Sequence, residues 1–455
     1  MATTVNSSTP NPPGTTGDSS TTGSPEAPVL DSKTVRRVTL AGCIGVFVEL
    51  YDNGIYGFLA GTLALVFFPG QSAQAAMLLT FLTFGIPFFV RPLGGIVCGY
   101  LGDRIGRQRM LVFVIMLISA ATAAIGLLPG YASIGIAAPI LLVLLRFAQG
   151  FSVGGEAAGA MTFLAEYAPE GRRGRLTSYA QIASFTALLV GTLTATTLNA
   201  TLSEDAMVSW GWRIPFLLAI PMGLIGFYLR KRIKDTPRFE QMKAEKKLSS
   251  NPMREAFSTK EHRKAVLLAM LIPLLNGSGY YVLFSYMPTY LNKELHFSVV
   301  QGLIVTACSL VAINIAIPYA GRLSDRLGRK KVIAGSAMAM AVLGYPCYLL
   351  LTQGSLALAI LGGILMAIVF AGHTGVIHIL LVELFPTRIR YSAYGFGYNI
   401  SAALFGGSAP FLMTWLIGLT GNTHIPAYYV VATALGTFFA VLRIRETAHT
   451  PLRDE

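Results

Sequence analysis

Two stretches of the chain repeat one charged pattern: GYLGDRIGRQR at residues 99–109 and GRLSDRLGRKK at residues 321–331. The matching positions stand 222 residues apart, as Asp103 and Asp325 illustrate. A solvated turn between helices does not need the same acidic residue, glycines and arginines at the same spacing twice. Two similar halves explain the repetition, because each half then carries its own copy of the loop. The pattern therefore predicts an internally duplicated chain.

The repeated loop also predicts contacts at one end of each half. Glycines permit a close approach of two helices, and the acidic and basic side chains can form ion pairs and contacts with helix ends. A second motif recurs with an offset of 217 residues, as EYAP at 166–169 and ELFP at 383–386. We expect the following residues to act as gates at this end: Gly99, Asp103, Arg104, Arg107, Glu156, Glu166, Arg173, Asp325, Arg326, Arg329, Glu383 and Arg388. For Glu156 a purely structural ion pair is the alternative.

The composition is that of a membrane protein. Only 13% of the 455 residues are charged, and the mean hydropathy is +0.58. Apolar stretches of about 20 residues recur, which is enough for a helix to cross a hydrocarbon core roughly 30 Å thick. Twelve such stretches begin near Val38, Met77, Met110, Ile134, Leu176, Trp212, Ala265, Val299, Lys331, Leu356, Tyr391 and Ile425. We therefore predict an all-α membrane protein with twelve transmembrane helices in two pseudo-symmetric six-helix bundles.

The net charge of +13 comes from basic residues whose placement along the chain indicates its orientation in the membrane. The loops at 67–76, 129–137 and 351–355 contain no Lys or Arg, whereas the alternate loops are rich in both. Basic residues accumulate on the cytoplasmic side of membrane proteins, so both termini are expected in the cytoplasm. This placement argues against a nucleic-acid partner and for a multi-pass protein of the plasma (inner) membrane, in contact with the lipid bilayer.

The chain divides into five segments by composition. Residues 1–32 are rich in Thr, Ser, Pro and Gly and are expected to be a disordered cytoplasmic tail. The two six-helix bundles are expected at 33–230 and 263–445, joined by a basic cytoplasmic linker at 231–262. Residues 446–455 form a second cytoplasmic tail in this scheme.

Nothing in the sequence indicates an enzyme or a metal protein. The four cysteines lie inside apolar segments without the spacing of metal ligands. No grouping of a nucleophile, a base and an orienting residue is visible, and no phosphate-binding loop. We therefore expect no catalytic residue, no metal site and no cofactor.

Charged side chains inside the predicted helices are the strongest functional candidates, because burying a charge in a membrane is costly. Glu49, Asp52 and Tyr56 share one face of the first helix, and two carboxylates this close favour one protonated group. Arg146 and Gln149 share a face of the fourth helix, and Arg91 lies deep in the second. Asp52, Glu49 and Arg146 are the candidates for proton coupling, and permanent ion pairs with Arg91 or Arg146 are the alternative.

The second half contributes polar and aromatic candidates rather than charges. The predicted substrate-binding residues are Arg91, Tyr56 and Gln149 from the first half and Asn276, Tyr280, Tyr281, His373, Tyr398 and Asn399 from the second. Packing alone is the alternative for each tyrosine, and a structural hydrogen bond is the alternative for His373. His378 follows five residues later and shares that helical face poorly, so it ranks lower.

These residues resemble the metabolite:proton symporters of the major facilitator superfamily. The resemblance rests on Glu49-Leu-Tyr-Asp52, on RPLGG at 91–95 and on RFAQGFSVGGE at 146–156. It continues in WRIPF at 212–216, ELFPTR at 383–388 and FGGSAP at 405–410. It departs from the family pattern at Val46 and Leu50, where the family usually has other residues. Since the first helix lines the cavity in this family, the resemblance leaves the substrate open.

The resemblance implies the major facilitator fold and a secondary active transporter. A proton would cross together with a small organic acid anion or zwitterion, such as shikimate, 2-oxoglutarate, citrate, an aromatic carboxylate, proline or betaine. Two basic residues at membrane depth favour a carboxylate as the small-molecule substrate. The proton is the only co-transported ion expected, and a monomer is expected. A proton-driven exporter of lipophilic drugs, which shares the duplicated loop, is the alternative.

Overall fold

The computed structural model contains helices and no strand among the residues it describes. These are residues 1–4, 32–105, 107–154, 161–162, 164–165, 168, 171–231, 252–448 and 450. Most of the expected N-terminal tail, much of the expected linker and the last five residues lie outside the described residues. Those three segment predictions therefore remain predictions.

The predicted number of membrane-spanning segments is confirmed. Among the described residues, nine segments are long and apolar enough to cross a membrane: Ala73–Cys98, Arg173–Thr201, Glu204–Leu229, Lys260–Lys293, Val299–Leu327, Arg329–Leu351, Leu356–Leu384, Ser392–Thr420 and Ile425–Leu442. The first span is a pair of helices, Gly42–Phe58 and Ala60–Phe67, bent by 69° at Leu59. Two shorter apolar helices, Val112–Leu127 and Ala137–Val153, complete the set of twelve.

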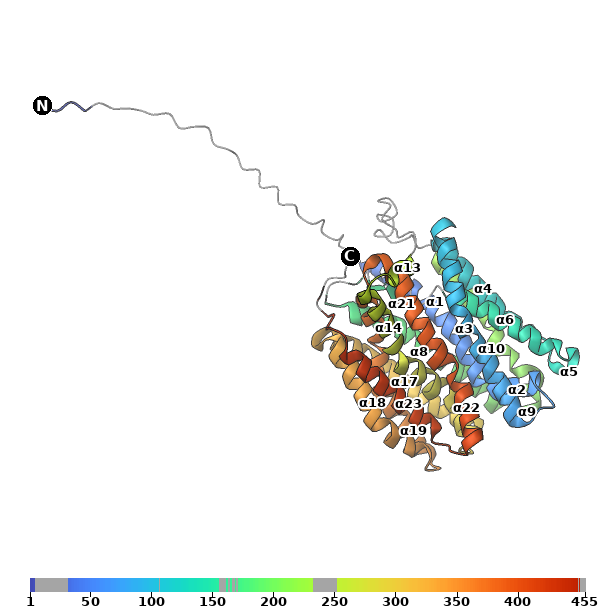
Figure 1. The fold of residues 1–455 in the computed structure, drawn as a ribbon. Helices are drawn as coiled ribbons and strands as arrows, with labels where there is room; N and C mark the ends of the chain where they lie inside the picture. Colours follow the sequence, from blue (N-terminus) through green and yellow to red (C-terminus); the bar gives the residue numbers. More distant parts are fainter. Residues whose placement is uncertain are drawn as a thin grey trace.

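Figure 1 shows the helices of the two halves. The N-terminal half contains α1 Ser32–Phe58, α2 Ala60–Phe67, α3 Ala73–Ile105, α4 Arg107–Leu127, α5 Tyr131–Ile134, α6 Ala137–Val153, α8 Arg173–Thr201, α9 Glu204–Ala206, η1 Met207–Gly211, α10 Arg213–Leu217 and α11 Ala219–Lys231. The C-terminal half contains α13 Pro252–Ala256, α14 Lys260–Leu271, α15 Leu274–Tyr280, η2 Tyr281–Tyr286, α16 Met287–Lys293, α17 Val299–Leu327, α18 Arg329–Leu351, α19 Leu356–Thr374, α20 Ile377–Leu384, α21 Thr387–Ser401, η3 Ala402–Gly407, α22 Ala409–Thr420 and α23 Ile425–Leu442.

The ends of α17 show how local sequence sets the helix boundaries. At its start Ser298 and Gln301 form a capping box, in which each side chain accepts a hydrogen bond from the other residue's backbone N–H. At its end Gly328 has φ +103°, a conformation that favours glycine, and α18 begins at the next residue. Gly328 belongs to the repeated loop, so one glycine of that pattern is explained by the backbone turn.

The two halves meet along two pairs of long segments. In Figure 1 the N-terminal half is blue to green and the C-terminal half yellow to red. α8 packs against α17, and α3 packs against α22 and η3, so each half contributes one helix to each seam. α21 also packs against α3 across the interface between the halves.

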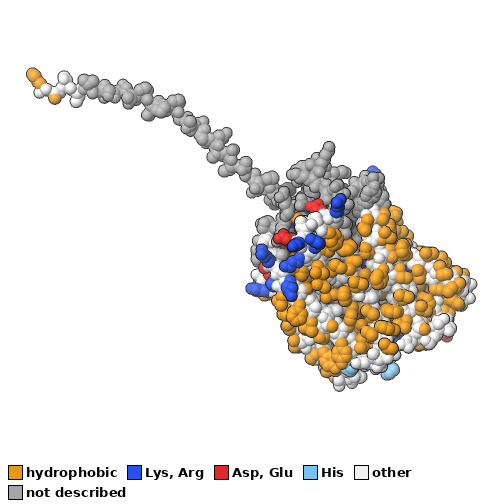
Figure 2. Space-filling model, in the orientation of Figure 1, with side chains coloured by type: hydrophobic (Ala, Val, Ile, Leu, Met, Phe, Trp, Pro, Cys, Tyr) orange, Lys and Arg blue, Asp and Glu red, His pale blue; other side chains and the backbone are white. Residues whose placement is uncertain are grey.

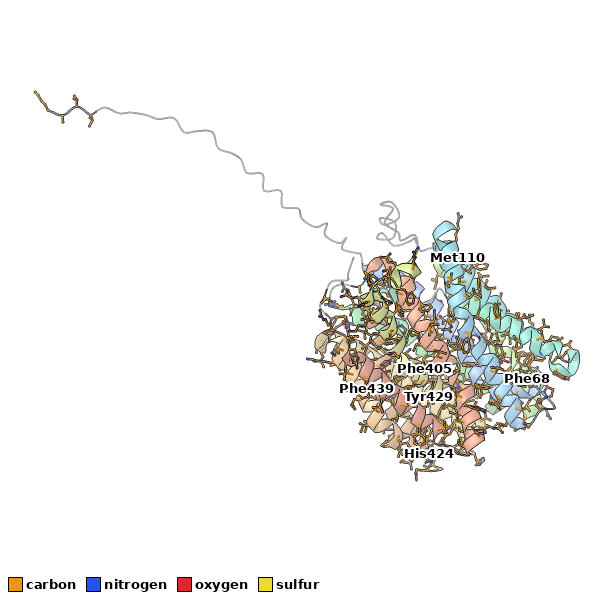
Figure 3. The ribbon with its side chains drawn as sticks, viewed as in Figure 1. Phe68, Met110, Phe405, His424, Tyr429 and Phe439 are labelled. Carbon is orange, nitrogen blue, oxygen red and sulfur yellow. The ribbon has the colours of Figure 1, made fainter. Side chains whose placement is uncertain are left out.

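The two ends of the molecule differ in chemistry. Lys and Arg side chains gather at one end, while hydrophobic side chains cover the face shown in Figure 2. We name this end the basic end; the side chains of Arg173, Arg329 and Lys330 lie there. Met110 lies toward the basic end in Figure 3, whereas Phe68 and His424 lie toward the opposite end. An apolar belt below a basic end suits a protein surrounded by lipid.

Candidate functional site

Asp52 lies in a buried network of hydrogen bonds on the inner face of α1. Its Oδ1 accepts hydrogen bonds from Thr122 Oγ1 at 2.7 Å and from Gln149 Nε2 at 2.6 Å. Its Oδ2 lies 3.4 Å from Arg146 Nη1. Gln149 Oε1 in turn accepts from Arg146 Nη1 at 3.0 Å. We call these four residues, which α1, α4 and α6 supply, the Asp52 cluster.

Arg146 is held by further contacts within the protein. Its Nη2 donates to Phe84 O at 3.0 Å, and its guanidinium lies 4.4 Å from the centre of the Tyr56 ring. The side chain is fully buried. A buried arginine surrounded by a carboxylate, an amide, a carbonyl and an aromatic face is well compensated. Tyr56 and Gln149, predicted to bind substrate, belong to this environment rather than to the cavity described next.

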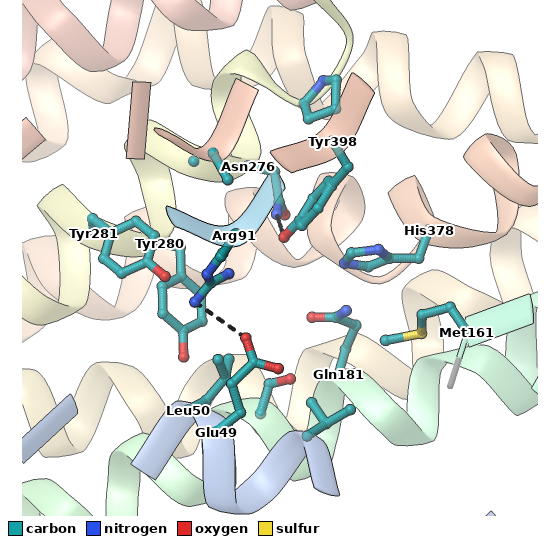
Figure 4. Close-up of a pocket in the computed structure, with 15 residues that line it drawn as sticks. Glu49, Leu50, Arg91, Met161, Gln181, Asn276, Tyr280, Tyr281, His378 and Tyr398 are labelled. Atoms are coloured by element: carbon teal, nitrogen blue, oxygen red, sulfur yellow. Dashed lines mark hydrogen bonds and ion pairs between the residues drawn. The ribbon is translucent and has the colours of Figure 1, made fainter. Parts of the chain in front are cut away.

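A small cavity lies between the two halves, beside the Asp52 cluster (Figure 4). Its volume is about 40 Å³, enough for a few water molecules. The N-terminal half lines it with Val46, Glu49, Leu50, Arg91, Met161, Gln181 and Ser184. The C-terminal half lines it with Pro273, Asn276, Gly277, Tyr280, Tyr281, His378, Tyr398 and Ala402. Both positions at which the sequence departs from the family pattern, Val46 and Leu50, therefore lie at the cavity wall.

Glu49 and Arg91 form an ion pair at the wall of this cavity. Arg91 Nη2 lies 3.2 Å from Glu49 Oε1, and both residues are about 3% exposed. The Arg91 guanidinium also lies 4.4 Å from the centre of the Phe88 ring, while its Nε has no hydrogen-bond partner among the described residues. The alternative of ion pairs within the protein is thus realised for both carboxylates, but only this pair borders a cavity.

Aromatic rings connect the two ion pairs. Phe84, near Arg146, lies 5.7 Å from Phe88, near Arg91. Tyr281 contacts both rings edge-on, at 5.8 Å and 5.0 Å between centroids, and also lines the cavity. The rings of Phe84, Phe88 and Tyr281 thus form a continuous packed path between Arg146 and Arg91.

Of the six residues predicted to bind substrate in the second half, four line the cavity and two do not. Asn276, Tyr280, Tyr281 and Tyr398 line the cavity, and Asn276 Nδ2 donates to Tyr398 OH at 3.2 Å. Asn399 does not line it; its Nδ2 donates to Gly154 O at 3.4 Å, across the interface between the halves.

His373 is the second of the two, since it is fully buried outside the cavity lining and stacks on Phe370. His378 lines the cavity instead and forms a 2.6 Å hydrogen bond with Tyr394 OH. The cause is a break between α19 and α20: α19 ends at Thr374, and Val376 has φ −121° before α20 begins. The regular helical phase assumed from the sequence does not continue through this break.

At the basic end the second copy of the repeated loop joins the two halves. Asp325 accepts hydrogen bonds from the backbone N–H groups of Gly174 and Arg175, both at 2.9 Å, at the start of α8. A carboxylate at a helix N-terminus is favourable because the first N–H groups lack partners within the helix. Arg329 Nη1 donates to Asp325 Oδ1 at 2.7 Å, and its Nε lies 3.4 Å from Glu383 Oε2. Asp325, Arg329 and Glu383 thus form one latch.

The segment after the last helix adds to this latch. We call residues 443–448 the C-terminal strap. Glu446 accepts hydrogen bonds from the N–H groups of Arg329 at 2.7 Å and Lys330 at 3.2 Å, and Thr447 donates to Glu383 at 2.6 Å. Arg173 donates to Thr450 O at 3.0 Å. Nothing in the sequence patterns indicated the contributions of Glu446 and Thr447, because single polar residues in a tail carry no periodic signal.

The first copy of the loop is described only in its backbone, as parts of α3 and α4. The side chains of Asp103, Arg104, Arg107 and Arg388, the surroundings of Gly99, and residues Glu156 and Glu166 lie outside the description. Arg326 is exposed and contacts no other described side chain. The gate roles of these residues remain predictions.

The two halves also contact each other away from the basic end, through α1, α3 and η2. Phe81 of α3 lies 5.6 Å from Tyr286 of η2, and Gly57 lies against Ser285 so closely that it leaves no room for a Cβ atom. The two halves therefore contact each other both at the latch and at Phe81 and Gly57.

Comparison with known proteins assigns the family. The model of the sugar (and other) transporter family matches residues 38–251 and 239–454. The chain belongs to this family of the major facilitator superfamily, and it is a transporter of the metabolite:proton symporter type rather than an enzyme. The resemblance drawn from the motifs is thereby confirmed.

Individual relatives match over nearly the whole chain. The transporter is 38% identical over 434 residues to the glycine betaine/proline/ectoine/pipecolic acid transporter OusA of Dickeya dadantii, covering 93% of this chain and 86% of that protein. It is 36% identical over 436 residues to the ectoine/proline transporter ProP of Corynebacterium glutamicum, with the same coverage. A solved structure of the proton:xylose symporter XylE has a TM-score of 0.74 at 19% identity, covering 93% of this chain and 98% of that one, which supports the fold.

Proposed function

We propose that this transporter takes up a small zwitterion together with protons across the plasma membrane. The observation that carries the substrate class is the Glu49–Arg91 ion pair, because it brings one negative and one positive side chain to the wall of one cavity. A zwitterion offers a carboxylate to the arginine and a cation to the glutamate. Both buried charges then remain compensated when the ligand separates them.

The relatives support this class over a simple anion. OusA is named for glycine betaine, proline, ectoine and pipecolic acid, and ProP for ectoine and proline. A carboxylate without a positive group would occupy Arg91 and leave Glu49 uncompensated. The two basic residues at membrane depth favoured a carboxylate as the substrate. We now propose, more narrowly, a carboxylate that also carries a positive group.

Asp52 is the proposed proton carrier. Its partners Thr122 and Gln149 still offer hydrogen bonds to a neutral carboxyl group, whereas the attraction to Arg146 depends on its charge. Protonation therefore weakens one contact of the cluster and keeps the others, which suits a group that must load and unload a proton reversibly. The packed rings between Arg146 and Arg91 carry the change to the substrate cavity.

Alternating access follows from the two sets of contacts around the cavity. Separation of Asp325 from the start of α8 would open the basic end, and separation of Phe81 from Tyr286 would open the other. We place the basic end and both termini in the cytoplasm on the positive-inside rule. One chain supplies both ion pairs and the whole cavity lining, so a monomer suffices. The proton is the only co-transported ion that the proposal requires.

The alternative of a drug exporter receives no comparable support. Such a protein would need a wide apolar cavity, whereas the wall of this one carries two opposite charges. We therefore retain uptake of a zwitterion as the single proposed function.

The test is uptake by purified protein in lipid vesicles. With an imposed inward proton gradient, radiolabelled proline or glycine betaine should accumulate, and Asp52→Asn should abolish accumulation while exchange of labelled for unlabelled substrate persists. Asp205→Asn is the matched control, because Asp205 is exposed in α9 and remote from the cavity lining. Accumulation that needs no gradient and survives in Asp52→Asn contradicts the proposed coupling.

A further inference from the structure

Besides Arg91 Nε, two buried polar atoms at the cavity have no hydrogen-bond partner among the described residues. They are Asn276 Oδ1 and the hydroxyl group of Tyr280, on side chains 4% and 5% exposed. Both residues belong to α15, four positions apart, and therefore share one helical face. Figure 4 shows them on either side of the Arg91 side chain. A buried acceptor without a donor is costly, so these atoms are suited to a ligand that supplies one.

The neighbours of Asn276 determine which of its atoms remains available. Its Nδ2 donates to Tyr398 OH at 3.2 Å, which orients the amide and leaves the carbonyl oxygen unpartnered. Tyr280 is fixed by its ring contacts with Tyr281, at 4.9 Å, and Phe185, at 5.1 Å. The cavity thus presents a fixed acceptor in the same lining as the negative charge of Glu49.

We propose that Asn276 Oδ1, assisted by the Tyr280 hydroxyl group, is the subsite that recognises N–H groups on the cation of the substrate. This inference rests on the proposed uptake of a zwitterion and adds a rule of selectivity to it. A secondary ammonium carries two N–H donors: Glu49 accepts one and Asn276 the other. A quaternary ammonium carries none, so it is held by the charge of Glu49 and by the faces of the surrounding tyrosine rings.

The size of the effect follows from the cost of a buried donor without an acceptor. Removing the acceptor leaves one N–H of a secondary ammonium unpaired, which should weaken its binding roughly 10- to 100-fold. A quaternary ammonium loses no hydrogen bond, so its binding should change less than about threefold. The measurable quantity is therefore the ratio between the two ligand types.

The experiment uses a series of ligands that differ only in N–H groups: proline, N-methylproline and N,N-dimethylproline. Each competes with labelled glycine betaine for uptake by the full chain in lipid vesicles. The test variant is Asn276→Leu, which has similar volume and no acceptor. Asn199→Leu is the matched control, because Asn199 lies in α8 outside the cavity lining and its Nδ2 donates to Ala195 O of the same helix. Thermal unfolding of each purified variant verifies folding.

We expect the wild type to lose affinity stepwise along the series. Asn276→Leu should remove the step from proline to N-methylproline and keep the step that depends on Glu49, whereas Asn199→Leu should keep both. Equal losses for all three ligands in Asn276→Leu, or equal steps in the variant and the wild type, overturn the proposal. If Asn276→Leu does not fold, Tyr280→Phe takes its place, with a smaller reduction of the steps expected and unchanged steps counting against the subsite. A wild type that takes up neither proline nor glycine betaine refutes the proposed function instead.

Discussion

Two ion pairs extend from the same face of α1, three residues apart, and their surroundings differ. Asp52 and Arg146 are surrounded by partners from the protein, including Thr122, Gln149 and the carbonyl of Phe84. Glu49 and Arg91 border a cavity instead. The Nε atom of each arginine lacks a described hydrogen-bond partner, so the difference lies in the surroundings of the carboxylates. Protein groups contact both oxygens of Asp52 in what we call the saturated pair, whereas the Glu49 pair is open to the cavity. The difference indicates that the first stores a proton within the protein while the second is open to a ligand.

The largest effect should come from breaking the saturated pair. Arg146→Met leaves Asp52 buried without its cation and removes the donor to Phe84 O, so the free energy of unfolding should fall by about 3–5 kcal/mol. Thermal or denaturant unfolding of the purified variant measures this. The double variant Asp52→Leu/Arg146→Met should recover much of the loss, since no buried charge remains. A double variant as unstable as the single one would argue against charge compensation as the cause.

Breaking the cavity pair should affect transport more than stability. Arg91→Met removes the proposed carboxylate anchor, and uptake at low substrate concentration should fall roughly 100-fold. The loss in unfolding free energy should be smaller than for Arg146→Met, because water in the cavity can solvate Glu49. Equal stability losses in the two variants would remove the distinction between a saturated and an open pair.

These two pairs also show what the sequence could and could not predict. Charged residues inside apolar stretches are visible in the sequence. The free-energy cost of burying a charge in a membrane was enough to identify Glu49, Asp52, Arg91 and Arg146 as candidates. Their pairing was not decided, because helix spacing gives the face of a residue but not the neighbour across the interface. The sequence ranked His378 below His373 because it assumed one regular helix. The break at Gly375 and Val376 shifts the helical phase and brings His378 to the cavity instead. Gln181, which lines the cavity from α8, resembles any polar residue of a membrane helix.

A third variant examines the contact between the halves. Asp325→Asn removes the charge at the start of α8 and keeps one oxygen acceptor, so one of the N–H groups of Gly174 and Arg175 loses its partner. The closed basic end should lose about 1.4 kcal/mol, a tenfold shift toward the open form. Ser178 is buried beside Gly321, so Ser178→Cys can report on opening when it is made in a background without the native cysteines. With Asp325→Asn this cysteine should react about tenfold faster with a thiol reagent than with Asp325 in place. Arg322→Gln, an exposed change on α17, is the control and should leave the rate unchanged.

The smallest effect should come from one hydrogen bond of the saturated pair. Thr122→Val keeps the shape of the side chain and removes the donor to Asp52 Oδ1, which should cost roughly 1 kcal/mol of unfolding free energy. Gln149 still donates to the same oxygen. Proton-driven accumulation should persist, at a shifted pH optimum. Loss of accumulation comparable with Asp52→Asn would show that Thr122 is part of the proton site itself.

The C-terminal strap has a practical consequence for handling the protein. Glu446 contacts the start of α18 and Thr447 contacts Glu383, so the last turns of chain beyond the membrane helices are structural parts of the closed basic end. An affinity tag or a fluorescent fusion partner attached directly after α23 would displace them and bias the protein toward the open form. Attachment beyond residue 450, or at the N-terminus, keeps both contacts in place.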